Sequence, residues 1–309
     1  MTVLISILST CFNNSKQLPE FLDKVRFHLE SLGHDFEVVV VDDRSTDESW
    51  SVISSVARTD TRVRGLLLSR NFGQHPAILA GLDAVRGDVV VLMDSDMDDD
   101  PAILPQLLAP VLKGEADLVL TRMHNHRRTR FSSRLFHRLV QMSTKSPQSI
   151  GIGTYRALSA TMVSALREYR DHSGVFGPLS TQIGFRHAWI DLPEDSFPRS
   201  PSRYNFRGRI RLALPLLLNE AGLPMKAVLT AAAFMATAVV SLGMIATVRF
   251  VNGGGDPFST TSLVFLVLVI NQLILSMGVA VIALYLRSIL KETLHRPRYH
   301  IAEVTAPTD

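Results

Sequence analysis

The 309-residue sequence predicts an open α/β domain followed by a pair of membrane-spanning helices. Two observations lead to this prediction. In the N-terminal part, short apolar runs alternate with stretches of helical periodicity, which is the pattern of a parallel sheet joined by right-handed crossover helices. Near the C-terminus, two long runs carry no charged residue, and each exceeds the roughly 20 residues that cross a bilayer.

The sheet is expected to contain five strands, because five apolar runs are short, continuous and bounded by turn residues. The apolar N-terminus has no basic segment before it, so we interpret it as the first strand and not as a signal peptide. The expected strands are residues 2–9, 36–42, 63–69, 88–94 and 116–121. The expected helices are residues 18–33, 47–57, 75–87 and 101–114.

Two uncharged runs, Ala227–Val248 and Ser259–Leu286, are the candidate membrane helices, with 22 and 28 residues. Their short glycine-rich connection favours a hairpin. Basic residues flank its outer ends, whereas only Arg249 lies at the turn, so both ends of the hairpin are expected in the cytoplasm. Two buried core helices are the alternative interpretation.

Composition limits the compartment and the partners. A single cysteine, Cys11, excludes an intrachain disulfide and fits a reducing compartment. The net charge of +3 is small for this length, and arginines gather next to the apolar runs, so no nucleic acid is expected as a partner. Segment 205–226 is apolar apart from charges such as Arg207 and Arg211, which predicts an amphipathic interfacial helix; an ordinary linker helix is the alternative.

Polar loops follow the first four expected strands, at residues 11–14, 42–49, 70–77 and 94–101. The carboxyl ends of parallel strands meet at one edge of a sheet, which is where such sheets bind ligands. Each loop alone is also compatible with an ordinary turn or helix cap. No glycine-rich phosphate loop follows the first strand, which argues against a dinucleotide site or a Walker-type site.

The fourth loop gathers five aspartates in the seven residues 94–100. Two carboxylates 4 Å apart repel by about 4 kcal/mol at an effective dielectric constant near 20. Such a loop is either open to water or neutralised by a cation. Asp94, Asp96 and Asp98 offer the oxygen ligands that Mg²⁺ or Mn²⁺ prefers, with phosphates completing the shell. Asp42 and Asp43 could accept hydrogen bonds from a base or a ribose, so a nucleoside diphosphate fits the pattern.

The stretches VVVVDDRSTDES and LSRNFGQHPAILAGLDAVRGDVVVLMDSDMDDDP resemble the family 2 glycosyltransferases with a GT-A fold. Within these, the chain resembles the membrane-anchored polyprenyl-phosphate glycosyltransferases, relatives of dolichol-phosphate mannose synthase. The resemblance implies a GT-A (Rossmann-like, nucleotide-diphospho-sugar transferase) domain. It also implies inverting, metal-dependent transfer of one sugar from a UDP-, GDP- or dTDP-linked donor to a polyprenyl phosphate of the undecaprenyl type.

Positions that match the resemblance give a set of expected site residues, together with the loops described above. The donor-binding residues are Thr10, Phe12, Asn14, Asp42, Asp43, Asn71, Gly73, Asp94 and Ser95, and the metal ligands are Asp94, Asp96 and Asp98. The residues that bind the acceptor or phosphate are Arg122, Arg127, Arg128, Arg130, Arg134, Ser202, Arg203 and Tyr204. The catalytic residues are Asp96, Arg122 and Arg199.

The sequence departs from the family pattern at several places, one of which is Asp98, where the family usually has Gln. Asn14 replaces an acidic residue that usually helps to bind the base, and Ser200 replaces a glycine. Segment 149–158 has no acidic residue where some relatives carry a candidate base. A degenerate nucleotide-binding scaffold of an envelope glycosylation complex and a synthase with another membrane acceptor therefore stay open. The Gln-x-x-Arg-Trp motif of processive polysaccharide synthases is absent from the sequence.

The expected domain organisation follows from these assignments. Residues 1–204 are the cytoplasmic GT-A catalytic domain and 205–226 the interfacial helix. Residues 227–251 and 262–286 are the membrane helices, 252–261 their external loop and 287–309 a cytoplasmic tail. We expect a multi-pass protein of the inner (cytoplasmic) membrane, in contact with the lipid bilayer and assembled as a homo-oligomer.

Overall fold

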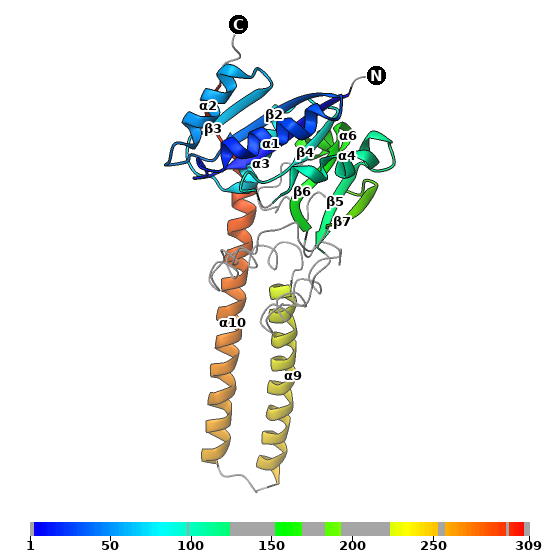
Figure 1. The fold of residues 1–309 in the computed structure, drawn as a ribbon. Coiled ribbons are helices and arrows are strands. Elements are labelled where there is room, and N and C mark those ends of the chain that lie inside the picture. The colour runs from blue at the N-terminus through cyan, green and yellow to red at the C-terminus, as the bar shows by residue number, and fades with distance from the viewer. Residues whose placement is uncertain are drawn as a thin grey trace. The chain divides into compact units, whose positions relative to one another are not determined.

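The computed structural model describes residues 3–97, 99–123, 152–168, 183–192, 223–252, 257–294 and 297–305. The described residues divide into two units. Residues 3–192 and 297–305 belong to a unit built on a β-sheet, and residues 223–294 belong to a unit of two long helices. Figure 1 labels the elements of both units.

The described residues of the first unit form an eight-stranded mixed sheet in the order β7-β5-β6-β4-β1-β2-β3-β8. Its strands are β1 (Leu4–Cys11), β2 (Asp35–Asp42), β3 (Val63–Leu68), β4 (Val89–Leu92), β5 (Leu118–Met123), β6 (Ile152–Ser159), β7 (His187–Leu192) and β8 (Ile301–Val304). The neighbours β4, β1, β2 and β3 are parallel. Their side chains are buried on both faces, as the continuous apolar runs predict.

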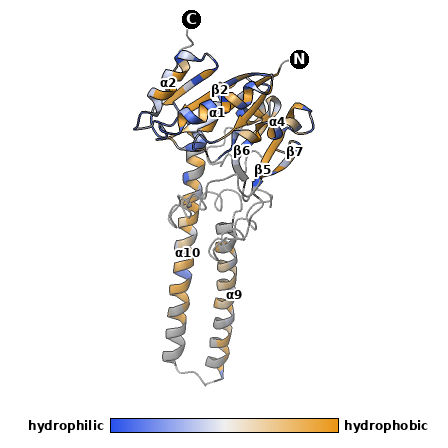
Figure 2. Ribbon diagram, viewed as in Figure 1, coloured by the Kyte–Doolittle hydropathy of each residue, from blue (hydrophilic) through white to orange (hydrophobic). Residues whose placement is uncertain are grey.

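Helices cover both faces of this sheet, and apolar side chains pack between the layers. One face carries α1 (Leu18–Glu30), α2 (Ser49–Thr59) and α4 (Leu104–Leu112), the last preceded by the short 3₁₀ helix η1 (Pro101–Ile103). The other face carries α3 (Gln74–Ala84) and α6 (Ala160–Glu168). Figure 2 shows the strands as largely hydrophobic and the connecting loops as hydrophilic.

The sheet differs from the expected five parallel strands. Strand β6 is antiparallel to both β4 and β5 and separates them, and β8 is antiparallel to β3. The expected strand 116–121 therefore does not lie beside the expected strand 88–94. Strands β6, β7 and β8 were missed because they mix polar or charged residues with apolar ones, and β7 and β8 lie at the two sheet edges.

The C-terminal segment belongs to the sheet. Beyond β8, two hydrogen bonds join Thr305 to Gly65 of β3. The N–H of Thr305 donates to the carbonyl oxygen of Gly65 (3.0 Å), and the N–H of Gly65 donates to Thr305 Oγ1 (2.9 Å). A side chain at Gly65 would meet Thr305 Cγ2 at 3.0 Å, so the glycine permits this approach. The Tyr299 hydroxyl donates a hydrogen bond to Asp83 of α3. The segment expected as a tail thus includes an edge strand.

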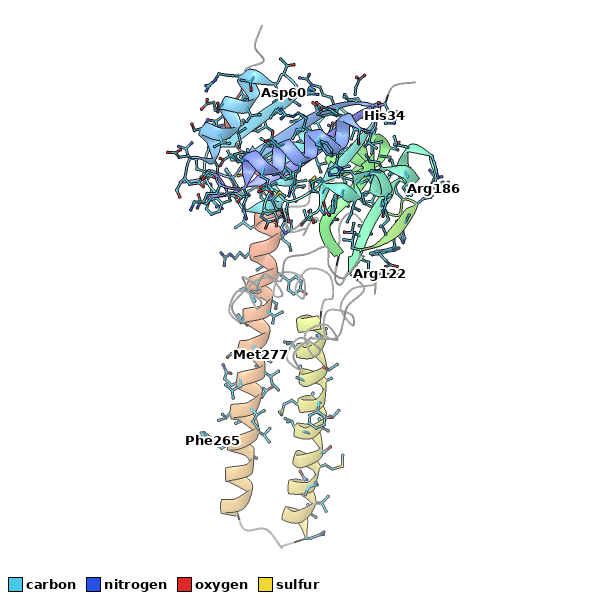
Figure 3. All side chains as sticks on the ribbon, viewed as in Figure 1. His34, Asp60, Arg122, Arg186, Phe265 and Met277 are labelled. Carbon is cyan, nitrogen blue, oxygen red and sulfur yellow. The ribbon has the colours of Figure 1, made fainter. Side chains whose placement is uncertain are left out.

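The second unit contains α9 (Leu223–Val251) and α10 (Pro257–Thr293), which pack against each other. At about 1.5 Å per residue, both exceed the roughly 30 Å of a bilayer core. Their described surfaces carry exposed apolar side chains, including Phe265 and Met277 of α10 (Figure 3). A side chain at Gly278 would lie 3.3 Å from Val228 Cγ1, so the two helices approach closely there.

One segment among the described residues, Val267–Arg287, is long and apolar enough to cross a membrane. In α9 the corresponding apolar stretch is the shorter Val228–Ser241. Of the two expected membrane helices, the second is therefore supported by one candidate segment, Val267–Arg287, and the first is not confirmed. Helix α10 continues past its expected end at residue 286. Of the expected interfacial helix 205–226, residues 205–222 lie outside the described residues and residues 223–226 belong to α9.

Candidate active site

The candidate site is the edge of the sheet at the carboxyl ends of β1, β2, β3 and β4. Three non-glycine residues of the described chain have positive φ angles: Asn13 (53°), Arg44 (60°) and Met97 (63°). They lie in the loops after β1, β2 and β4. Such conformations cost about 1 kcal/mol or more each, and they gather where a loop is shaped for a ligand. The backbone therefore singles out the same edge as the polar loops do.

Hydrogen bonds join three of these loops into one surface. The side-chain nitrogen Nδ2 of Asn14 donates to the carbonyl oxygen of Ser95 (2.6 Å), and Ser95 Oγ donates to the carbonyl oxygen of Thr10 (3.0 Å). Asn13 Oδ1 accepts from the backbone N–H of Thr46 (2.7 Å). A carboxylate at position 14 could not donate to Ser95, so the replacement of the family's acid by Asn14 gives this loop a different partner.

Phe12 is the apolar part of this edge. Its side chain is 49% exposed although it directly follows a buried strand. A flat aromatic ring next to polar loops offers a face on which a nucleobase can stack. This arrangement is compatible with the expected donor-binding role of Phe12.

Asp42 and Asp43, at the end of β2, are buried, with exposed fractions of 0% and 4%. Both Asp43 oxygens accept backbone N–H groups, from Phe72 (2.7 Å) and Gly73 (2.8 Å), so Asp43 holds the loop that begins α3. Asp42 Oδ1 accepts from the N–H of Ser45 (2.6 Å), whereas its Oδ2 has no hydrogen-bond partner among the described residues.

Burial raises the pKa of both Asp42 and Asp43 above the ordinary value, and the backbone N–H groups partly oppose this shift. An ionised, buried carboxylate oxygen without a donor costs free energy. Asp42 Oδ2 is therefore a buried acceptor whose hydrogen-bonding capacity the described residues leave unused. Asp43 instead fixes the backbone of the loop that contains Gly73. The φ angle of Gly73 is 96°, a conformation that glycine adopts readily.

Three described aspartates of the fourth loop, Asp94, Asp99 and Asp100, have different hydrogen-bond partners. Asp99 accepts the backbone N–H of Asp94 (2.8 Å), and Asp100 caps η1 by accepting the N–H of Ala102 (3.0 Å). Asp94 accepts from the amide of Gln74 at the start of α3 (2.9 Å). Asp94 and Asp96 are both partly exposed. Asp99 and Asp100 thus shape the loop, while the side chains of Asp94 and Asp96 stay partly exposed to solvent.

The donor set fits a divalent ion that is shared with a ligand. No group of three or more His, Cys, Asp or Glu side chains in the described ranges could hold a metal ion by itself. Two carboxylates on one loop suit Mg²⁺ or Mn²⁺, which commonly complete their shell with phosphate oxygens and water. The residues present therefore fit a metal that binds together with a nucleotide.

Arg122, an expected phosphate ligand, lies in β5 and not after it. Its guanidinium donates to Asp191 of β7 (Nε to Oδ1, 2.8 Å) and lies 5.8 Å from the centre of the Trp189 ring (Figure 3). The Arg122 and Asp191 side chains are 52% and 47% exposed. Solvent-exposed ion pairs contribute little to stability, so this guanidinium can exchange its partner.

Arg156 of β6 is a charged residue that the sequence analysis did not select. It is 2% exposed, and its Nε donates to the carbonyl oxygen of Thr154 (3.1 Å). An arginine between Tyr155 and Ala157 in a strand-like stretch was the available signal, because a charge on a two-sided buried strand needs a partner.

Several expected site residues lie outside the described residues. They are Asp98, Arg127, Arg128, Arg130, Arg134, Arg199, Ser202, Arg203 and Tyr204. Asn71 is exposed in the loop after β3. The described edge therefore brings together the expected donor and metal residues, while Arg122 lies farther along the sheet, on β5.

Comparison with known proteins identifies the family of the chain. Residues 6–168 match Glycosyl transferase family 2. An undecaprenyl-phosphate 4-deoxy-4-formamido-L-arabinose transferase of Shewanella sediminis is 27% identical over 304 residues, covering 97% of this chain and 92% of the relative. The transferase of the same name from Pseudomonas fluorescens is 30% identical over 310 residues, covering 97% and 90%.

A solved structure shares the fold. Glucosyl-3-phosphoglycerate synthase from Mycobacterium tuberculosis, crystallised with Mn²⁺ and uridine-diphosphate-glucose, superposes with a TM-score of 0.52 at 19% identity. The match covers 71% of this chain and 79% of that chain. The first unit therefore has the GT-A α/β fold of nucleotide-sugar transferases, with a mixed sheet.

Proposed function

The chain belongs to glycosyl transferase family 2, and on that premise we propose that it transfers one sugar from a nucleotide-sugar to a polyprenyl phosphate of the undecaprenyl type. It is a glycosyltransferase by family. The observation that carries the acceptor assignment is that relatives named for undecaprenyl phosphate match 97% of the chain, including the helical unit.

The donor is proposed to bind at the edge formed by the loops after β1, β2 and β4. Phe12 offers a face to the base, and Asp42 Oδ2 is a buried acceptor that lacks a donor among the described residues. Uracil, thymine and guanine each carry a ring N–H that a carboxylate can bind. The base-binding role of Asn14 is the weaker part of the assignment, because its amide nitrogen is already bonded to Ser95.

Asp94 and Asp96 are proposed to hold Mg²⁺ or Mn²⁺ together with the donor diphosphate, with Asp98 as a third candidate. When bound, the ion would offset the negative charge that develops on the leaving nucleoside diphosphate. Gln74 and Asp99 support this arrangement, because they fix the side chain and the backbone N–H of Asp94.

The acceptor is proposed to react without a dedicated base. A phosphate monoester has a second pKa near 6, so its oxygens are largely anionic at neutral pH. One of these oxygens forms a bond to the anomeric carbon as the bond to the diphosphate breaks, which inverts the configuration. The acceptor then needs cationic positioning, for which Arg122, Arg199 and the arginines of 127–134 are candidates.

The membrane arrangement is proposed to be a two-helix hairpin with the sheet unit in the cytoplasm. Strands β1 to β8 belong to one sheet, with β3 and β8 as neighbours, so all eight strands lie on one side of any membrane. If Val267–Arg287 crosses, the chain has to cross once more between residues 192 and 267. Helix α9 is the long helix described in that interval, which supports it as the second span.

Cysteine labelling tests this arrangement in a Cys11→Ala background. Gly254→Cys in the connection should react with a membrane-impermeant thiol reagent in intact cells. Lys24→Cys on α1 and Glu303→Cys on β8 should react only after permeabilisation, and they should do so together because both lie in the sheet unit. Labelling of Glu303→Cys from the side opposite to Lys24→Cys would contradict the hairpin.

The function itself is tested with purified full-length protein, Mn²⁺ or Mg²⁺, undecaprenyl phosphate and a panel of radiolabelled UDP-, GDP- and dTDP-sugars. The expected product is a labelled lipid that dissolves in organic solvent and releases the sugar under mild acid. Binding of nucleotide and metal without transfer from any donor would favour a nucleotide-binding scaffold instead.

A further inference from the structure

Arg156 is placed by the sheet on the same face as the aspartate loop. In β6 it lies directly opposite Leu92, the last residue of β4, and Leu92 and the neighbouring pair Val90 and Leu158 all belong to one buried cluster. Asp94 follows Leu92 by two residues, which is the next position on that face. Diagonal neighbours of this kind are within reach of a long side chain.

The guanidinium is a buried charge that needs compensation. Arg156 is 2% exposed and its Nε donates to the Thr154 carbonyl oxygen, so a full positive charge lies inside the sheet unit, where it needs negative partners. Burial lowers the pKa of Arg156 to about 10, and attraction to Asp94 and Asp99 opposes that shift. The arginine therefore stays charged at neutral pH, close to Asp94, one of the carboxylates proposed to receive a metal ion.

We infer that Arg156 is a counter-cation that positions the aspartate loop when no metal is bound and competes electrostatically with the divalent ion for Asp94. This inference builds on the metal assignment of the proposed function. Its consequence is that Mn²⁺ alone binds weakly, because a positive charge already lies beside the carboxylates. A nucleoside diphosphate adds negative charge and extra oxygen ligands, so metal and nucleotide bind more strongly together.

The test measures Mn²⁺ binding to full-length protein by electron paramagnetic resonance, with and without UDP, GDP and dTDP. Arg156→Met removes the charge and keeps much of the side-chain length. It should bind Mn²⁺ alone roughly tenfold or more tightly than wild type, since a like charge next to the ion is removed. It should also unfold at a lower temperature in chelator and gain more from Mn²⁺ than wild type gains.

Arg167→Met is the matched control. Arg167 packs on the same face, where its guanidinium donates to the carbonyl oxygens of Leu82 and Val85, both at 2.7 Å. Its loss should lower thermal stability and leave the affinity for Mn²⁺ unchanged. If Arg156 had only a structural role, Arg156→Met would likewise lower thermal stability and leave the affinity for Mn²⁺ unchanged. Arg156→Lys, which keeps the charge, should bind Mn²⁺ nearly as wild type does.

Two results would overturn the inference in different ways. If wild type and Arg156→Met bind Mn²⁺ alone equally, the counter-cation role is wrong while the metal site stands. If wild type binds no Mn²⁺ even with a nucleotide, the metal assignment fails and the inference with it. Should Arg156→Met not fold, Asp94→Asn in the same chain decides: recovery of folding supports the charge pair, and continued unfolding contradicts it.

Discussion

The two ends of the same parallel strands differ in how their charges are balanced. At the amino end, Glu37 accepts from Ser6 Oγ and from the N–H of Arg86, both at 2.6 Å, and pairs with the guanidinium of Arg64. At the carboxyl end, Asp42 keeps an oxygen that no described residue bonds, and left-handed residues shape the loops. The Glu37 carboxylate is fully paired by the protein, whereas Asp42 keeps one acceptor oxygen that the described residues do not use.

This difference separates stability from function within one sheet. At the amino end, a change should alter the free energy of unfolding and leave the chemistry alone. Removal of a carboxylate from the carboxyl end should reduce transfer or nucleotide binding without lowering the free energy of unfolding. Burial and repulsion of the carboxylates at that end make the native state less stable than it could be. The four predictions below test that division, from the largest expected effect on transfer or nucleotide binding to the smallest.

Asp96→Asn is expected to have the largest effect, a loss of transfer of roughly a thousandfold or more, because it removes a proposed metal ligand. The thermal unfolding temperature should stay the same or rise, since one repelling charge is lost. Transfer is measured with labelled donor, and unfolding in the same detergent. Excess chelator should abolish wild-type transfer, and Mn²⁺ should restore it. Full turnover in chelator would contradict the metal assignment.

Arg122→Ala should reduce transfer by roughly a hundredfold, as loss of one positioned charge donor does in other enzymes. Asp191→Ala removes only the partner and should leave transfer near the wild-type level. Because the pair is exposed, neither change should measurably lower the unfolding temperature. Equal losses of transfer in the two variants would show that Arg122 acts through its ion pair and not on a phosphate.

Asp42→Asn should weaken nucleotide binding by roughly 10- to 100-fold, the range for a hydrogen bond to a charged group. The single amide oxygen would be taken by the N–H of Ser45, which leaves an NH₂ group facing the base N–H. Binding is measured by isothermal titration calorimetry with UDP, GDP and dTDP. Unchanged affinity for all three would remove Asp42 from the donor site.

The same variant also has a pH signature. Burial raises the pKa of Asp42 in the folded state above its unfolded value. The contribution of this group to stability is therefore fully present below the unfolded pKa, near 4, and is lost as pH rises through the folded pKa. Asp42→Asn should flatten that decline in unfolding temperature, and a wild-type decline that persists in the variant would contradict it.

Glu37→Ala, at the amino end, should lower the free energy of unfolding by about 3 kcal/mol, because it leaves Arg64 and two hydrogen-bond donors without their acceptor. Transfer per folded molecule should be unchanged. Denaturant unfolding and the transfer assay on the same preparation check both statements. A loss of transfer at wild-type levels of folded protein would mean that the two ends of the sheet are coupled.

The parallel core could be predicted from the sequence because each of its strands is identified by its own consecutive residues. Strands such as β2 are continuous apolar runs, and the loops that follow them carry the polar residues. The direction of a side chain is not local. Asp42 and Asp43 were both predicted to face a nucleoside, yet Asp43 gives both oxygens to the backbone of Phe72 and Gly73, which lie about thirty residues further along the chain.

Strands β6 and β8 show the other limit of prediction. The pattern of β6 is broken by Arg156, whose neighbouring negative charges, Asp94 and Asp99, come from the loop after β4. Strand β8 has four residues, of which Ala302, Glu303 and Val304 are exposed. Neither strand carries the apolar periodicity that identifies a buried element. The same reasoning that finds the donor edge therefore misses the antiparallel strand that places a cation beside it.

The position of β8 in the chain sets an order of events during synthesis. More than a hundred residues, including α9 and α10, separate the end of β7 from β8. At about 5–20 residues per second, the ribosome needs roughly 5–20 s to make them. During that interval β3 is an open edge of Leu66, Leu67 and Leu68, able to pair with another chain. Only a polypeptide that has completed both helices can close its own sheet.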